Sequence, residues 1–252
     1  MRGLPRRLRY GEEATLVEHL DELRTRIIVV LVTLAVTTAV TFTFHSHLIR
    51  WLERALPPDK RHLVTFSVAE PFVTSFMVSV YAAVVICLPV LLWQIWAFFA
   101  PAFQERSQRA ALLMVLLAGV LAVGGLAFGY WVVLPKALHF LTNYDDSLYR
   151  IQIRARDYFS FATTVLLAII GIFELPVIVL GLVRMGILTS AQLRRNRRWG
   201  YFIVAFIALG LPGPDPVTTA LELLPMWAIF EASIWLAVLV ERRSARAEPE
   251  PA

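Results

Sequence analysis

Residues 161–183 read FATTVLLAIIGIFELPVIVLGLV, and this stretch decides the fold class of the chain. It is long and apolar enough to cross a bilayer, because a helix needs about 20 mainly apolar residues to cover the ~30 Å hydrocarbon core. Glu174 nevertheless lies near its middle, followed by Pro176. An ionisable group at that depth costs roughly 2.5–3.5 kcal/mol on insertion scales, so it needs a partner, a proton or a water-lined face. Glu174 is therefore a candidate functional residue; the alternative is a protonated glutamate that is hydrogen-bonded within a helix bundle.

The composition of the whole chain indicates a membrane protein. Apolar residues make up 58% of the 252 positions and charged residues 17%, whereas soluble domains average about 25% charged residues. This is too little polar surface to cover a protein of this size in water. The single cysteine, Cys87, lies in an apolar run, which excludes an internal disulfide and fits a simple packing role.

Six apolar stretches predict six transmembrane helices. Helix is expected in each, because lipid offers no hydrogen-bond partner to an exposed backbone group. The stretches cover residues 27–44, 72–99, 110–134, 161–183, 199–211 and 217–240. We expect an all-α, polytopic integral membrane protein with one membrane domain over residues 1–240. It would begin with a cytoplasmic amphipathic segment, residues 1–26, and be followed by a disordered cytoplasmic tail, residues 241–252.

The distribution of charge predicts the orientation. With a cytoplasmic N-terminus, the inner segments hold twice as many Lys and Arg residues as the outer segments. The positive-inside rule therefore places both termini in the cytoplasm. We expect no cleavable signal peptide, because a charged segment precedes the first apolar run and no small-residue cleavage site closes that run.

The segment before the first predicted span is amphipathic. Four apolar side chains recur there at helical spacing: Leu16, Leu20, Leu23 and Ile27. We expect a helix that lies at the membrane surface. Glu18 and Glu22 are four residues apart, so their carboxylates are neighbours on one helix face and destabilise it mildly unless a cation lies between them. The alternative is a solvated face on which Glu22 pairs with Arg26.

Several motifs, in the same order along the chain, resemble those of TatC proteins, the signal-peptide receptors of the twin-arginine translocase. HLDELRTR at 19–26 is similar to the signature H-L-x-E-L-R-x-R at the start of that family. The resemblance continues through AEPF at 69–72, LPVLLWQIWAFFAPAF at 88–103, FELP at 173–176, MGILTSAQLRRNRR at 185–198, PGPD at 212–215 and PMWAIFE at 225–231. It covers residues 14–241 and implies a cupped bundle of six helices, of which the fifth and sixth are short.

The resemblance implies a site for consecutive arginines at the cytoplasmic end of the bundle. Glu22 matches the family glutamate that receives these arginines, Arg24 matches the arginine of the same motif, and Phe98 matches a residue that lines the site. Many members carry a second glutamate where this chain has Ser107, and Glu105 is the candidate replacement. A carboxylate suits this role, because a planar guanidinium binds it through two parallel hydrogen bonds that lysine cannot reproduce.

Further polar residues match family positions. Glu174 matches an intramembrane glutamate on the concave face of the bundle, which implies a polar contact with single-span subunits of the TatA and TatB type. Gln94 matches a polar position in the second helix, and we group it with Glu174 as an intramembrane polar residue for contact with partner subunits. Asp215 matches an aspartate in the outer turn between helices five and six; the alternative is a plain turn residue in Pro-Gly-Pro-Asp. Glu231 is another candidate, and the alternative for Glu231 and for Glu222 is pairing within the bundle.

The implied function is that of a receptor in protein export. It would bind twin-arginine signal peptides of folded cargo proteins, assemble with TatA- and TatB-type subunits and with further copies of itself, and depend on the proton gradient across the bacterial cytoplasmic (inner) membrane. An ion-coupled transporter would show several mid-membrane carboxyls or a repeat, and an intramembrane protease would need a catalytic constellation. We therefore expect no enzyme, cofactor, metal site or nucleic-acid partner. His45 and His47 form a lone H-x-H pair, more typical of an interface than of a metal site.

Overall fold

The computed structural model describes residues 16–99, 108–145, 148–149, 151–210 and 216–247, and within these ranges the chain is helical and forms no strand. The elements follow in the order α1 (Leu16–Thr43), α2 (His45–Glu53), η1 (Pro58–Lys60), α3 (Glu70–Phe99), α4 (Gln108–Phe128), η3 (Gly129–Val133), α5 (Leu134–Asn143), α6 (Ala155–Phe173), α7 (Leu175–Arg184), α8 (Ser190–Arg195), α9 (Arg197–Leu209) and α10 (Pro216–Ala247).

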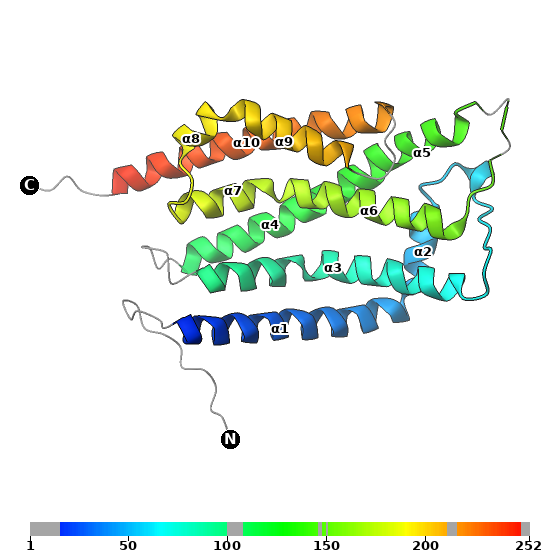
Figure 1. Ribbon diagram of the computed structural model, residues 1–252, viewed down its shortest axis with the longest axis horizontal. Helices are drawn as coiled ribbons and strands as arrows, with labels where there is room; N and C mark the ends of the chain where they lie inside the picture. The colour runs from blue at the N-terminus through cyan, green and yellow to red at the C-terminus, as the bar shows by residue number, and fades with distance from the viewer. Residues whose placement is uncertain (1–15, 100–107, 146–147, 150, 211–215, 248–252) are drawn as a thin grey trace, which may run out of the picture.

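The long helices run side by side along the longest axis of the molecule (Figure 1). α1 lies at one edge of the bundle, beside α3. The other side of α3 packs against α4 and α6. At the opposite edge, α10 packs with α7 and α9. Within the described ranges, five helical segments are long and apolar enough to cross a membrane: His19–Thr43, Glu70–Ile95, Leu112–Asn143, Ala155–Arg184 and Glu222–Arg242. α9, the predicted fifth span, has 13 residues and covers about 20 Å at 1.5 Å per residue, less than the ~30 Å core.

α1 contradicts the prediction of a separate helix lying at the membrane surface. It continues without a break from Leu16 to Thr43 and is straight in Figure 1. The reason is local, because no glycine or proline interrupts these residues and a helix that has formed gains one backbone hydrogen bond for each residue it adds. The amphipathic motif is therefore the first part of the first membrane helix.

The C-terminal end of the last helix also differs from the prediction. α10 extends through Ala247, so it includes part of the tail that we expected to be disordered from residue 241 onward. Glu241 ties this end of the helix to the bundle, because its Oε1 accepts a hydrogen bond from the backbone N–H of Ser190 at 2.7 Å. That bond to the start of α8 stabilises a helical turn that composition alone does not favour.

The fourth predicted span is interrupted between α6 and α7, where the sequence places Glu174 and Pro176. Pro176 has no N–H to donate and its ring crowds the preceding turn, so a regular helix cannot continue through it. The turn is closed by other bonds: the Glu174 N–H donates to the Ile170 carbonyl at 3.1 Å, and the Val177 N–H donates to the Glu174 carbonyl at 3.0 Å. The break thus lies at the glutamate itself.

The third predicted span, residues 110–134, is longer than expected, because α4, η3 and α5 continue one another through Asn143. η3 is a π-helical turn directly before Pro135, and the N–H of Leu134 closes it on the Gly129 carbonyl. A Cβ at Gly129 would lie 2.8 Å from the terminal Cδ2 atom of Leu166 on α6, so any side chain there would require Leu166 to shift. The missing side chain lets the two helices approach closely.

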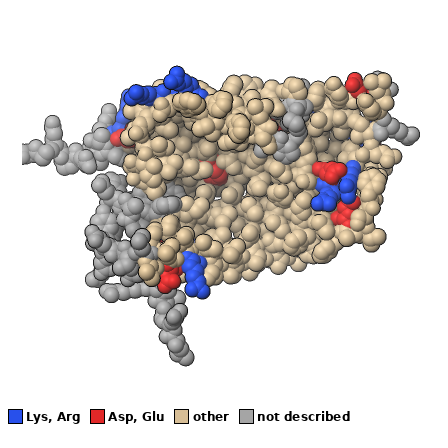
Figure 2. Space-filling view, in the orientation of Figure 1, with Lys and Arg blue, Asp and Glu red and all other residues tan. Residues whose placement is uncertain are grey.

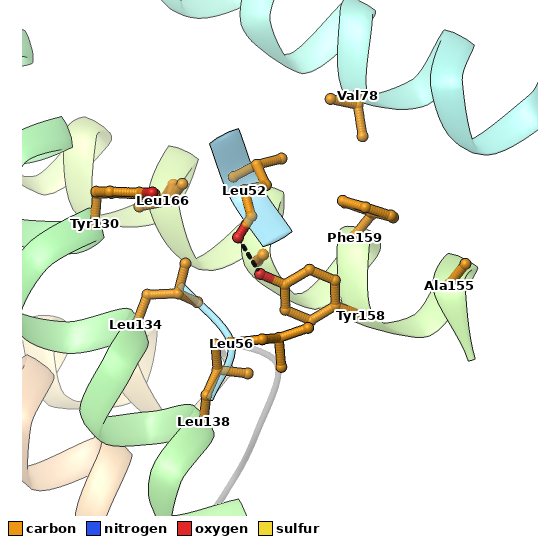
Figure 3. Packing of buried hydrophobic residues seen from close by; sticks show 11 residues of the cluster. Leu52, Leu56, Val78, Tyr130, Leu134, Leu138, Ala155, Tyr158, Phe159 and Leu166 are labelled. Atoms are coloured by element: carbon orange, nitrogen blue, oxygen red, sulfur yellow. Dashed lines mark hydrogen bonds between the residues drawn. The ribbon is translucent and has the colours of Figure 1, made fainter. Parts of the chain in front are cut away.

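A hydrophobic core lies at the end of the bundle where α2 folds back against it (Figure 3). Its buried side chains are Leu52, Leu56, Val78, Tyr130, Leu134, Leu138, Ala155, Tyr158, Phe159, Ala162 and Leu166. Two tyrosines hold α2 in place through its backbone: the Tyr158 hydroxyl donates to the Leu52 carbonyl at 2.5 Å and the Tyr130 hydroxyl donates to the Trp51 carbonyl at 2.7 Å. Figure 3 shows the Tyr158 hydroxyl pointing at the Leu52 carbonyl.

Gly200 offers a direct test of the packing between α9 and α10. A Cβ there would overlap the buried ring of Phe230 and lie 2.6 Å from its Cε1 atom. We therefore expect Gly200→Ala to lower the free energy of unfolding by about 1–3 kcal/mol, the usual range for overpacking. Thermal unfolding in detergent measures the effect.

Gly171→Ala is the matched control for this substitution. Gly171 lies within α6, and a Cβ there would meet no atom within 4 Å. Alanine at an open helical position is neutral or stabilises by up to about 1 kcal/mol. An equal loss of stability in both variants would contradict the packing of α9 on α10.

Candidate functional site

The first candidate site lies where α1 begins and α3 ends (Figure 1). At its centre, Nε and Nη2 of Arg26 donate to Oε1 of Glu22 at 3.1 and 2.5 Å. The same guanidinium donates from Nη1 to Gln94 Oε1 at 3.2 Å and from Nη2 to the Ala97 carbonyl at 2.8 Å. Arg26 therefore connects the carboxylate on α1 with the last turns of α3.

The pair of Glu22 and Arg26 is the i,i+4 contact that the sequence offers as an alternative for this segment. It is not fully solvated, because the two side chains keep 25% and 22% of their surface exposed. Gln94, which we grouped with Glu174 as a polar residue for partner contact, accepts a hydrogen bond from Arg26 and so belongs to this cluster. The structure thus joins the motif at the start of α1 to a polar residue of α3 that is 68 positions away.

Aromatic side chains line the same site. Phe98 stacks on His19 with 4.3 Å between the ring centroids. We predicted Phe98 but not His19 as a site residue, although His19 opens the HLDELRTR motif. Arg24 is exposed on α1. Glu105 and Ser107 lie outside the described residues.

The second candidate site is Glu174, at the break between α6 and α7. Its side chain is buried, with 3% of its surface exposed, and neither carboxyl oxygen has a hydrogen-bond partner among the described residues. Its neighbours pack against different elements: Phe173 lies on Gly125 of α4, and Leu175 packs in the cluster that α9 and α10 share. A carboxyl in such a place needs a proton or a polar partner from outside this part of the chain.

Three acidic residues singled out in the sequence remain: Glu231, Glu222 and Asp215. Glu231 accepts a hydrogen bond from the Tyr201 hydroxyl, and its other oxygen lies 3.5 Å from Nη2 of Arg197. This confirms the alternative of pairing within the bundle. Glu222 is buried in α10. Asp215 lies outside the described residues.

A third polar cluster, which we did not predict, lies at the opposite end of the bundle. Arg154 binds both oxygens of Glu70, with Nε to Oε1 at 2.9 Å and Nη2 to Oε2 at 3.0 Å. The same carboxylate accepts the backbone N–H groups of Phe66 and Arg156. Next to it, the β-bridge between Val64 and Arg154 joins the two loops.

This cluster acts as a clamp between the loop before α3 and the start of α6. The Glu70 side chain is 2% exposed, and its hydrogen bonds raise the pKa of Arg154 above the usual value. Glu70 belongs to the AEPF motif, so the motif was the available signal. Its partner Arg154 is 84 residues away and could not be identified from spacing.

Charged side chains on the surface also gather at the two ends of the bundle. Figure 2 shows Lys and Arg gathered near the end where α1 begins and α8 lies, and again at the opposite end. The band between them carries almost no charge on this face. Such a band, together with helices of membrane-spanning length, fits a bundle surrounded by lipid.

The fold and its apolar band define a multi-pass helical membrane protein. Residues 18–225 match the family model of the Sec-independent protein translocase protein TatC, and the chain belongs to this family. Members of this family are components of a protein translocase and not enzymes. The predictions of a transport function and of no enzymatic activity are therefore confirmed.

Named relatives and solved structures agree with this assignment. The chain is 33% identical to the TatC protein of Deinococcus radiodurans over 89% of its own length and 86% of that protein, and 30% identical to the TatCd protein of Bacillus subtilis over 94% and 97%. Crystal structures of the twin-arginine translocase receptor TatC superpose with TM-scores of 0.77 and 0.79 at 29% identity. The two superpositions cover 88% and 87% of this chain, and 98% and 99% of the crystallised chains. This similarity confirms the predicted all-α membrane fold.

The clamp of Glu70 and Arg154 can be tested by a double-mutant cycle. Glu70→Gln removes the charge that Arg154 pairs with and replaces one acceptor oxygen by a donor, so we expect the Tm to fall by several degrees. Adding Arg154→Gln should cost little more, because the two residues act as one unit. Arg50→Gln, at an exposed arginine of α2, is the control and should leave the Tm unchanged. Additive losses from the two single variants would show that no clamp exists.

Proposed function

We propose that this chain is the receptor subunit of a twin-arginine translocation system in the bacterial cytoplasmic membrane. It binds the twin-arginine signal peptides of folded cargo proteins at the end of the bundle where α1 begins, with both termini in the cytoplasm. The observation that carries the proposal is the partly exposed carboxylate of Glu22 beside the stacked rings of His19 and Phe98. α1 begins and α10 ends at this same end of the bundle, in agreement with the positive-inside orientation (Figure 1).

The chemistry of this site suits an arginine followed by an apolar segment. A guanidinium presents two parallel N–H donors to a carboxylate, and charge-assisted bonds of this kind are about twice as strong as neutral ones. The rings of His19 and Phe98 offer an apolar and polarisable surface, and His19 lies three residues before Glu22 on the same face of α1. Arg24 belongs to the same motif, and Glu105 is our candidate for the carboxylate that receives a second arginine.

Glu174 is proposed as the contact for partner subunits. Its buried carboxyl has no hydrogen-bond partner in the described part of the chain, and a polar group on a neighbouring single-span helix would supply one. TatA- and TatB-type subunits are the partners that this role requires, with the proton gradient as the source of energy and further copies of this chain in the complex. Gln94 stays a candidate for the same contact.

Replacing the receptor carboxylate should weaken binding of a twin-arginine peptide. We expect Glu22→Ala to cost about 2 kcal/mol, the lower end of the range for truncating one member of a charge pair, because this side chain is 25% exposed. Glu22→Gln should lose nearly as much, since the amide carries no charge. Peptide affinity in detergent or nanodiscs measures both effects.

Asp21→Asn is the matched control, because Asp21 is an exposed neighbour of Glu22 on α1. It removes the same charge and should leave the peptide affinity unchanged. Wild-type affinity in both Glu22 variants would reject Glu22 as the receptor carboxylate.

Replacing Glu174 should separate partner assembly from peptide recognition. Glu174→Leu removes every polar contact and should abolish crosslinking to TatA- or TatB-type subunits and stop export. Glu174→Gln keeps hydrogen bonding and should retain part of both. Signal-peptide affinity should be normal in the two variants, because Glu174 lies about 15 Å from the end of α7 at 1.5 Å per residue. Full export by Glu174→Leu would make this glutamate a packing residue.

A further inference from the structure

We infer that residues 63–69, the segment that leads into α3, form a lipid anchor: the clamp of Glu70 and Arg154 holds this segment in the headgroup region of the membrane, where Phe66 and Val68 contact lipid. The segment lies at the end of the bundle opposite to the start of α1 (Figure 1). The partner is the membrane surface itself, so the inference is independent of the peptide site.

The composition of this segment suits contact with lipid. Its sequence, LVTFSVA, contains no charged residue, whereas residues 50–62 before it are rich in charged side chains. Phe66 nevertheless keeps 71% of its surface exposed, and Val68 is fully exposed. Large apolar side chains gain free energy on leaving water, so these two point to an apolar neighbour outside the chain.

The segment leads directly into an aromatic surface on the membrane helices. Near the end of α1, the ring of Phe42 lies 5.9 Å from that of Phe72 and 6.1 Å from that of Phe76, both in the first turns of α3. Phe72 and Phe76 are exposed and belong to a helical segment of membrane-spanning length. The lipid-facing surface of α3 therefore reaches its first turns, next to residues 63–69.

The length of α3 gives the depth of the segment. At the other end of this helix, Gln94 accepts a hydrogen bond from Arg26 at 3.2 Å, which marks a polar level. Glu70 lies 24 residues before Gln94, or about 36 Å at 1.5 Å per residue. The hydrocarbon core is ~30 Å thick, and the headgroup regions extend the bilayer to about 40–45 Å. With Gln94 at one edge of the core, Glu70 and the segment before it lie among the headgroups of the opposite leaflet.

The clamp fits the segment for this position. Arg154 binds both oxygens of Glu70, at 2.9 and 3.0 Å, so neither charge enters the interface unpaired. The Phe66 N–H donates to Glu70 Oε2 at 3.1 Å, and the N–H and carbonyl of Val64 bond to residues 153–155 at 3.0 and 2.9 Å. The Arg154 guanidinium also lies 5.5 Å from the centre of the Phe66 ring. These bonds hold the backbone inward while the apolar side chains stay open to lipid.

The test measures the surroundings of a spin label at position 68. The chain has one cysteine, so Cys87→Ala combined with Val68→Cys leaves a single thiol to label. The full-length protein is placed in vesicles of phosphatidylethanolamine and phosphatidylglycerol. Oxygen concentrates in lipid and a polar nickel chelate stays in water, so the ratio of their collision rates with the label reports lipid contact.

Two further labels provide the references. Asp59→Cys, at an exposed position of η1, is the reference for water. Val36→Cys is the reference for hydrocarbon, because Val36 is exposed on α1 about 15 Å from Arg26 at 1.5 Å per residue. We expect the ratio of oxygen to nickel collisions at position 68 to lie between the two references and at least about threefold above that at position 59.

Glu70→Gln tests the contribution of the clamp. It removes the charge that holds Arg154, so the label at position 68 should become more mobile and its collision ratio should fall toward that of position 59. The label at position 36 should be unchanged in the same variant, which controls for loss of the fold.

Each outcome decides the inference. A ratio at position 68 equal to that at position 59 overturns it, because the segment would then lie in water. Low collision rates with both reagents overturn it as well, since protein would then cover the segment. A lipid-like ratio that persists in Glu70→Gln contradicts the role of the clamp. A lipid-like ratio that is lost in Glu70→Gln, with position 36 unchanged, supports the anchor.

Discussion

The structure depends on one constraint: a polar group in the hydrocarbon core needs a hydrogen-bond partner that lipid cannot supply. Helices solve this for the backbone, and each described segment of membrane-spanning length is helical. Where the helix is interrupted, other groups replace the missing bonds. The turn at Pro176 is closed through the carbonyl of Glu174, and η3 accommodates Pro135 with a wider turn.

The same constraint sorts the acidic side chains. Glu22 and Glu70 lie at opposite ends of the bundle, and each is paired with an arginine. Glu231 is paired with Arg197. Glu174 stands apart among these residues, because both of its oxygens are without a hydrogen-bond partner in the described part of the chain. A bundle that pairs Glu22, Glu70 and Glu231 with arginines and leaves both oxygens of Glu174 without a partner in its described part has a polar position suited to a second protein.

The two paired ends differ in what their pairing allows. Glu70 is 2% exposed, binds its arginine with both oxygens and accepts two backbone N–H groups, so it has little capacity for another ligand. Glu22 is 25% exposed and binds Arg26 through one oxygen. Complete satisfaction fits a structural clamp, whereas incomplete satisfaction fits a site where partners are exchanged.

The sequence by itself determined the helical class and the approximate spans, and it marked Glu22, Phe98 and Glu174 as candidate site residues. These follow from short-range patterns, such as apolar length, helical spacing and ordered motifs, which a linear chain displays. Tertiary structure decided the rest. The bonds of Arg26 to α3 and the clamp of Glu70 with Arg154 were not predicted. The two clusters join residues far apart in sequence, and hydrogen-bond geometry between distant residues arises only when the helices pack.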